Sequence, residues 1–350
     1  MDRRGKYDMD HREVGPDGPL EGDRMAATSS PPIVVRLTQE DSARHFAADI
    51  RQGLACRPRW IPPKWLYDPL GCELFETITT LEEYYPTRAE RAILEAHADD
   101  IAKLSGAATL IELGSGTSDK TLRLIDALSS AGSLERFVGF DVAEPTLSDA
   151  LIGLARRYPT LELSGVVGDF ERHLDALPDV AGRMIVLLGG TVGNLDPGRR
   201  AALLGDMAML LHPGEHLLLG IDLVKDPFRL VAAYNDRQGV TERFERNILT
   251  VVNTTLGATF DPATFDYVAR WVPKASRIEM VLRSRLAQRV EVRDLHLIVD
   301  LEAGENIQTE ISTKFSVDGM AAELAAAGLG VVGTWTDPAG DFALMLAERR

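Results

Sequence analysis

Short apolar runs alternate with helical stretches through the middle of the chain. The runs are TLIEL (109–113), RFVGFDV (136–142), LELSGVVGDF (161–170), RMIVLLGG (183–190) and HLLLGIDLV (216–224). Between them, segments such as SDKTLRLIDALSSAG and GRRAALLGDMAMLLHPG carry apolar residues at helical spacing. Strands that are apolar at nearly every position and alternate with helices are typical of a parallel sheet covered on both faces. The pattern therefore predicts an α/β fold.

The pattern changes on either side of this centre. Before it, LEEYYPTRAERAILEAHADDIAKL predicts a turn and a long helix, with Thr87 as N-cap and Glu90 at the spacing of a capping box. After Val224, the segments IEMVLRSRLAQRVEV, LHLIVDL and NIQTEISTKF alternate apolar and polar residues, which predicts antiparallel strands of a second, smaller subdomain. The final LGVVGTWTDPAGDFALMLAERR predicts a hairpin that returns to the main sheet.

Composition limits the classes of function. The 350 residues are 45% hydrophobic and carry a net charge of −15, so we expect a globular core and no nucleic-acid partner. Residues 1–32 mix charges with Gly, Pro and Ser and predict a disordered leader without a secretory signal. The chain has two cysteines, Cys56 and Cys72, and no apolar run near the ~20 residues that span a bilayer. We therefore expect a cytoplasmic protein that does not bind membranes.

A glycine loop, ELGSGTS (112–118), lies between the first central strand and the following helix. Doubly wound sheets bind ligands at this position, and Gly114 and Gly116 allow the backbone to approach a ligand closely. Two glycines fit a plain tight turn equally well. The dinucleotide fingerprint requires a third glycine, but Asp119 stands there and would repel a pyrophosphate.

Acidic residues end the next two strands. Asp141 is placed to accept the hydroxyls of a ribose, and Asp169 and Phe170 suit the amino group and ring face of an adenine. Together they favour adenosine without phosphate, and hence S-adenosylmethionine. Lys120 is either a partner for the methionine carboxylate or an exposed helical lysine.

The candidate methyl-acceptor site combines a loop and a strand. Asn194, after the fourth strand, offers a donor and an acceptor for an amine and a carboxylate, although it is equally suited to a turn before Asp-Pro. Alternation places Glu310 and Ser312 on one strand face, roughly 6–7 Å apart. That pair could bind the two nitrogens of an imidazole, or it could belong to a solvated face. His212 and His216 have a helix-breaking Pro-Gly between them, so we expect no metal site.

Several motifs together resemble the L-histidine Nα-methyltransferases of ergothioneine biosynthesis. The motifs are KWLYD, EEYYPTRAE, IELGSGTSDKT, LGGTVGNL, DLVKD, RIEM, TEISTKF and TDPAGDF, in constant order from about residue 36 to the C-terminus. The resemblance implies a Rossmann-like class I methyltransferase sheet, residues 89–224 and 315–350, that binds S-adenosylmethionine. It also implies a smaller α+β substrate domain formed by residues 33–88 and 225–314.

The resemblance further implies a role for individual residues. The residues implied to contact S-adenosylmethionine are Gly114, Lys120, Asp141, Asp169 and Phe170. The residues implied to bind the substrate are Tyr84, Asn194 and Tyr234 at its α-amino and α-carboxyl end, Glu310 and Ser312 at its imidazole, and Met280 and Tyr67 along the pocket. Tyr67 and Asn194 are the implied catalytic residues, with Tyr67 or water accepting the proton of the amine.

The implied reaction is stepwise methylation of the α-amine of L-histidine to the trimethylated betaine, hercynine, by a monomer. Two alternatives stay open at this point. One is methylation of another aromatic amino acid such as tryptophan, against which Glu310 and Ser312 favour an imidazole over an indole. The other is a non-catalytic protein that binds S-adenosylmethionine, against which the complete set of acceptor residues argues.

Overall fold

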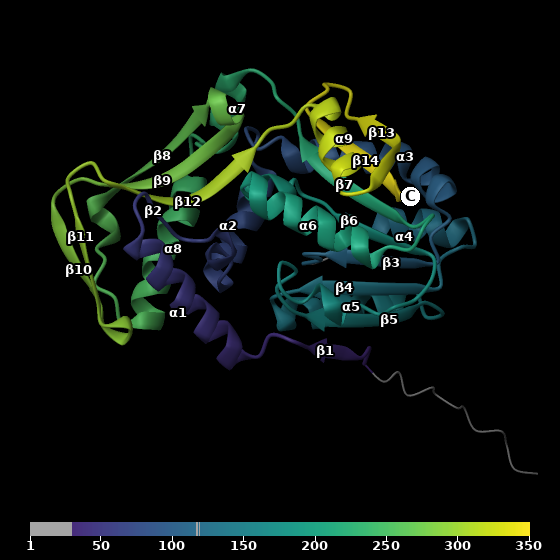
Figure 1. Ribbon diagram of the computed structural model, residues 1–350, viewed down its shortest axis with the longest axis horizontal. Coiled ribbons are helices and arrows are strands. Elements are labelled where there is room, and N and C mark those ends of the chain that lie inside the picture. The colour runs from purple at the N-terminus through teal and green to yellow at the C-terminus, as the bar shows by residue number, and fades with distance from the viewer. Residues whose placement is uncertain (1–29, 117, 119) are drawn as a thin grey trace, which may run out of the picture. The chain divides into compact units, whose positions relative to one another are not determined.

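The computed structural model describes residues 30–116, 118 and 120–350 of the chain (Figure 1). Residues 1–29 of the expected leader, and Asp119 in the glycine loop, lie outside the described residues. Within the described ranges, no helix is both long enough and apolar enough to cross a lipid bilayer.

The main sheet of the described chain has eight strands in the order β1-β5-β4-β3-β6-β7-β14-β13. They are β1 Ile33–Val35, β3 Thr109–Leu113, β4 Arg136–Asp141, β5 Glu162–Val167, β6 Arg183–Leu187, β7 His216–Asp222, β13 Leu329–Thr336 and β14 Phe342–Arg349. Strands β1 to β7 of this sheet are parallel, and β14 runs antiparallel to β7 and β13. The predicted central strands and C-terminal hairpin are confirmed, because strands buried on both faces are apolar throughout.

Helices cover both faces of this sheet. They are α3 Pro86–Ser105, α4 Leu122–Ser130, α5 Glu144–Arg157, α6 Pro197–Leu210 and α9 Val317–Ala326. Side chains alternate along a strand, so Leu110 packs in the apolar cluster with α3, α4 and α5, while the next residue, Ile111, packs with α6 and α9. This two-sided arrangement is the Rossmann-like α/β fold.

The start of α3 differs from the prediction. The helix begins at Pro86, so Thr87 lies inside the first turn and is not the N-cap, and Tyr85 precedes the helix without a side-chain cap. Proline suits the first helical position because its fixed φ is helical and it has no N–H to leave unpaired. Glu90 therefore does not take part in a capping box, and its side chain is fully buried.

A second sheet of the described chain has four strands in the order β2-β12-β9-β8, and β10 and β11 form a separate hairpin. These strands are β2 Arg59–Trp60, β8 Phe265–Val272, β9 Arg277–Ser284, β10 Gln288–Val292, β11 Leu297–Leu301 and β12 Asn306–Thr313. The helices whose apolar residues pack with them are α1 Gln39–Ala55, α2 Pro69–Thr80, α7 Pro227–Ala233 and α8 Val240–Leu256. The predicted antiparallel strands are confirmed by the pairs β9–β12, β8–β9 and β10–β11.

The two ends of the N-terminal segment join different sheets. Ile33–Val35 pairs with β5 of the main sheet, although the sequence places it in the substrate domain. This short apolar run extends the edge of the parallel sheet, whereas Arg59–Trp60 pairs with β12 of the second sheet. The division into two domains otherwise remains a prediction.

The second sheet meets the main sheet where β12 ends. β12 contacts the 3₁₀ helix Thr191–Asn194, which follows β6, and Phe315 forms a β-bridge with Leu223 just after β7. Figure 1 shows the chain continuing from β12 towards α9 of the main sheet. Gly193 makes this approach possible, because a Cβ at that position would lie 2.8 Å from the carbonyl oxygen of Thr313.

We predict that Gly193→Ala lowers the free energy of unfolding by about 1–3 kcal/mol, the usual cost of overpacking against atoms that cannot move aside. Gly205→Ala is the matched control, because it lies inside α6 with open space where the Cβ would be, and alanine favours a helix. Denaturant unfolding of both variants measures the effect. A Gly193→Ala protein as stable as the Gly205→Ala protein would contradict the proposed close approach.

Candidate active site

The glycine loop after β3 lies against the end of β4. Gly114 and Gly116 have φ values of 68° and 48°, and the space where a Cβ would stand is open at both. The carboxylate of Asp141 accepts hydrogen bonds from the backbone N–H of Gly116 at 2.8 Å and of Ala143 at 2.9 Å. Burial raises the pKa of Asp141, and these backbone donors oppose that rise. The loop is thus an open cradle beside a carboxylate whose position is fixed.

The end of β5 provides the second acidic residue and the aromatic ring. Asp169 is buried, and its Oδ2 accepts a hydrogen bond from Lys64 at 3.0 Å. Burial raises the pKa of Asp169, but Lys64 and a backbone donor outweigh burial and bring the pKa below its ordinary value. Phe170 packs against the apolar cluster beneath α6. The sequence analysis missed Lys64, because it comes from the distant 3₁₀ helix Pro63–Leu66 and also pairs with Asp49.

Lys120, expected to bind the methionine carboxylate, pairs with a protein carboxylate. Its Nζ lies 2.7 Å from Glu90 Oε2, while Glu90 Oε1 accepts the backbone N–H of Gly189 at 2.7 Å. Gly220 of β7 leaves the space that Glu90 occupies, because a Cβ there would lie 2.5 Å from Oε1. Glu90 therefore joins α3 to the loops after β3 and β6, and the ligand role of Lys120 remains a prediction.

The predicted acceptor residues lie in one cluster of contacting side chains. Asn194 donates from Nδ2 to Glu310 Oε1 at 2.9 Å, and the hydroxyls of Tyr234 and Ser312 are 2.8 Å apart. The buried ring of Tyr84 meets that of Tyr234 edge to face at 6.0 Å.

The other two predicted pocket residues lie beside this cluster. Met280 is fully buried on β9 directly opposite Glu310. The ring of Tyr67 meets Phe75 and Phe244 edge to face, and about a third of the residue is exposed. Burial, with the negative charge of Glu310, raises the pKa of Tyr67 well above its ordinary value, so the phenol keeps its proton at neutral pH.

Ser312 is buried and Glu310 is partly buried, so this strand face is not a solvated one. The face is inward because the loop that carries Asn194 and the buried side chain of Tyr234 lie against it. Polar side chains on such a face must pair with one another or with a ligand.

A second buried carboxyl group, Glu245 of α8, faces Glu310. Glu245 is fully buried, and within the described residues neither of its oxygens has a hydrogen-bond partner while both carboxyl groups are ionised. Burial and the charge of Glu310 raise the pKa of Glu245 well above its usual range. Burial raises the pKa of Glu310 to about 7, although hydrogen bonds from Glu245 and Asn194 and the charge of Lys314 oppose the rise. Glu245 therefore holds the proton, and Glu310 is the member of the pair that ionises above a pH of about 7.

Glu245 has a sequence signal that the analysis did not use. It lies one helical turn after Thr241, within the apolar face formed by Phe244, Ile248 and Leu249 of α8. A carboxyl group on the buried face of a helix is rare unless it is paired. Its partner on β12 could not be read from spacing alone.

Comparison with known proteins gives the family. Residues 46–349 match the model of the histidine-specific, SAM-dependent methyltransferases. The chain belongs to this family. It is 50% identical over 313 residues to a histidine N-alpha-methyltransferase of Mycolicibacterium smegmatis, covering 89% of this chain and 98% of the relative. It is 51% identical over 311 residues to a histidine N-alpha-methyltransferase of Mycobacterium tuberculosis, covering 88% and 97%. It is also 32% identical over 288 residues to ergothioneine biosynthesis protein 1 of Neurospora crassa, covering 80% of this chain and 32% of that longer protein.

The residues at the ends of β3, β4 and β5 fit the cofactor of this methyltransferase family, S-adenosylmethionine. The open Cβ positions at Gly114 and Gly116 leave room for a ligand against the backbone, and Asp141 lies beside them as an acceptor for hydroxyl groups. The cradle carries no basic residue that would favour a pyrophosphate in the described part of its loop. The contacts of individual residues with the cofactor remain predictions.

We predict that Asp141→Ala weakens binding of S-adenosylhomocysteine by about tenfold to a hundredfold, the effect of removing charged hydrogen-bond acceptors. Asp126→Ala is the control, since Asp126 is on α4 and pairs with Arg157 and Tyr158 away from the loop. Titration calorimetry measures both variants. Equal affinities in the two variants would remove Asp141 from the cofactor site.

Proposed function

We propose that this methyltransferase transfers methyl groups from S-adenosylmethionine to the α-amino nitrogen of L-histidine. The observation that carries the proposal is the pair Glu310 and Ser312, two positions apart on the inward face of β12. Glu310 is hydrogen-bonded to Asn194, which follows β6 of the main sheet. A carboxylate beside a hydroxyl matches the N–H and the bare nitrogen of an imidazole.

The other pocket residues have distinct proposed roles. Asn194 holds Glu310 with its amide N–H, which leaves its Oδ1 to accept a hydrogen bond from the α-amine. Tyr84 and Tyr234 bound the amino-acid end of the substrate, and their rings favour the methylated ammonium through cation–π contact of roughly 0.5–2 kcal/mol. Met280 forms the apolar wall opposite Glu310.

Catalysis by these residues is mainly positioning. S-adenosylmethionine supplies an electrophilic methyl group on a sulfonium. The protein holds the amine in line with that group, which can lower the barrier by several kcal/mol, and excludes water. Because the pKa of Tyr67 is raised, its phenol can accept a proton from the amine only while it passes its own hydrogen to water.

We further infer the product of the reaction and which parts of the chain bind the cofactor and the substrate. Successive transfers give the trimethylated betaine of histidine, and the Neurospora relative supports a place in ergothioneine biosynthesis. Residues 89–224 and 315–350 bind S-adenosylmethionine, and residues 33–88 and 225–314, apart from strand β1 of the main sheet, select the substrate. We also infer that the protein is a monomer that acts on a small molecule in the cytoplasm, and the net charge of −15 argues against a nucleic-acid partner. Light scattering of the purified protein tests the monomer.

We predict that the wild-type protein methylates histidine when it is offered a panel of amino acids. Glu310→Ala should lower kcat/KM for histidine about a hundredfold, because the ring N–H of the substrate loses its acceptor, while the affinity for S-adenosylhomocysteine stays unchanged. Glu279→Ala is the control, because Glu279 lies on neighbouring β9 and pairs with Arg270 and Arg277. Mass detection of the products gives the rates. Tryptophan as the preferred substrate would support the indole alternative, and no transfer to any amino acid would support a binding protein.

We predict that kcat/KM for histidine falls as the pH drops below about 7. The pKa of Glu310 is raised from 4.5 to about 7, so its accepting carboxylate is populated above that pH and lost below it. Glu310→Gln keeps an acceptor but cannot titrate, so its profile should follow the substrate alone. Identical acid limbs in the two proteins would contradict the assignment to Glu310.

A further inference from the structure

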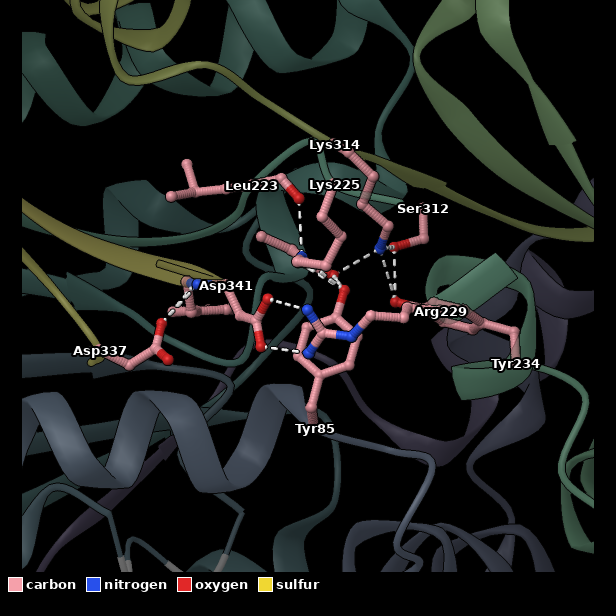
Figure 2. Close-up of polar contacts among 11 residues, drawn as sticks. Tyr85, Leu223, Lys225, Arg229, Tyr234, Ser312, Lys314, Asp337 and Asp341 are labelled. Atoms are coloured by element: carbon pink, nitrogen blue, oxygen red, sulfur yellow. Dashed lines mark hydrogen bonds and ion pairs between the residues drawn. The ribbon is translucent and has the colours of Figure 1, made fainter. Parts of the chain in front are cut away.

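Lys314, immediately after β12, is a buried lysine with three hydrogen-bond acceptors. Its Nζ lies 2.7 Å from Asp222 Oδ2, 2.8 Å from the hydroxyl of Tyr234 and 2.6 Å from Ser312 Oγ. Figure 2 shows the ammonium between Ser312 and Tyr234. The side chain is 0% exposed. A protonated lysine has three N–H donors and no acceptor, so all three are used here.

Asp222 keeps this ammonium charged. Burial lowers the pKa of Lys314, but the carboxylates of Asp222 and Glu310 oppose that effect. Asp222 also accepts from Tyr85 at 2.8 Å and from Lys225 at 2.5 Å. Above a pH of about 7, where Glu310 is ionised and Glu245 is protonated, the two lysines are balanced by Asp222 and Glu310. The charges of the cluster cancel, as a buried cluster requires.

Lys314 occupies one acceptor position on each of the two hydroxyls. Ser312 and Tyr234 each accept one N–H, and they share one hydrogen bond of 2.8 Å between them. The geometry allows either hydroxyl to donate in that bond, and the greater acidity of a phenol favours Tyr234 as the donor and Ser312 as the acceptor. Ser312 then accepts twice, and its own hydrogen is left to donate outward.

Resting on the proposed function, we propose that Lys314 is a positioning residue that holds Ser312 as a hydrogen-bond donor. The site would then bind the neutral imidazole of histidine in preference to an imidazolium or to a ring without a second nitrogen. Glu310 accepts the single ring N–H, and Ser312 donates to the bare ring nitrogen. An imidazolium presents a second N–H to a donor. An indole or a pyrrole leaves the Ser312 hydroxyl buried without an acceptor, which is costly.

The test compares ligands that differ at one ring atom. The pyrrol-2-yl and pyrrol-3-yl analogues of alanine keep one ring N–H and replace the other ring nitrogen by C–H. The dissociation constants of the two analogues and of histidine are measured by calorimetry with saturating S-adenosylhomocysteine at pH 8.5. At this pH the imidazole of histidine is neutral and Glu310 is ionised. The readout is the affinity of histidine divided by that of the better-bound pyrrole.

We expect the wild-type protein to prefer histidine by about tenfold or more, the usual effect of an unpaired buried donor. Lys314→Met removes the N–H that holds the Ser312 hydroxyl in one orientation, so the preference for histidine over the pyrrole should fall at least about threefold. Lys225→Met is the matched control. Lys225 is also buried and binds the same Asp222, but its other acceptors are Tyr85 and the backbone of Leu223, so the preference should be kept.

Ser312→Ala should lose the same preference, and Lys314→Met should add nothing further in that background, because Lys314 acts through Ser312. Additive losses, or an unchanged preference in Lys314→Met, would overturn the proposal. Melting temperature and S-adenosylhomocysteine binding report folding, and Lys314→Gln replaces Lys314→Met if the latter does not bind the nucleoside. A wild-type protein that does not bind histidine would instead refute the proposed function.

Discussion

The carboxylate of Asp222 lies at the last position of β7, and donors from three other parts of the chain converge on it. Tyr85 precedes α3, Lys225 follows β7 and Lys314 follows β12. A buried carboxylate is stable only when it is paired and hydrogen-bonded, so removing either lysine or the Tyr85 phenol destabilises this junction. This one charge therefore fixes the end of the acceptor strand against the main sheet.

The site depends on that junction because methyl transfer is a problem of placement. The cofactor cradle belongs to the ends of β3, β4 and β5, whereas the imidazole pair belongs to β12 of the other sheet. Asn194 spans the gap from the main sheet to Glu310, and Gly193 lets the two backbones approach. A shift of about 1 Å between reacting groups can cost a hundredfold in rate. Two buried salt bridges, Glu90–Lys120 and Asp222–Lys314, hold the loops on which this placement depends.

The sequence was informative where one physical rule dominates. Strands buried on both faces gave unbroken apolar runs, and the alternation in NIQTEISTKF correctly placed Glu310 and Ser312 on the same face. The rule failed where pairing joins distant segments. Thr87 and Glu90 have capping-box spacing, yet Pro86 begins the helix and Glu90 turns inward. The partners Glu245, Asp222 and Lys64 are recognised only when the fold brings them within hydrogen-bonding distance of residues far along the chain.

The protonation state of the bound imidazole tests the account most directly. Histidine labelled with 15N in the ring can be bound to the wild-type protein with S-adenosylhomocysteine and observed by NMR at pH 7. The account predicts one protonated ring nitrogen, hydrogen-bonded to Glu310, and one bare nitrogen that accepts from Ser312. Two protonated ring nitrogens, the signature of a bound imidazolium, would contradict it.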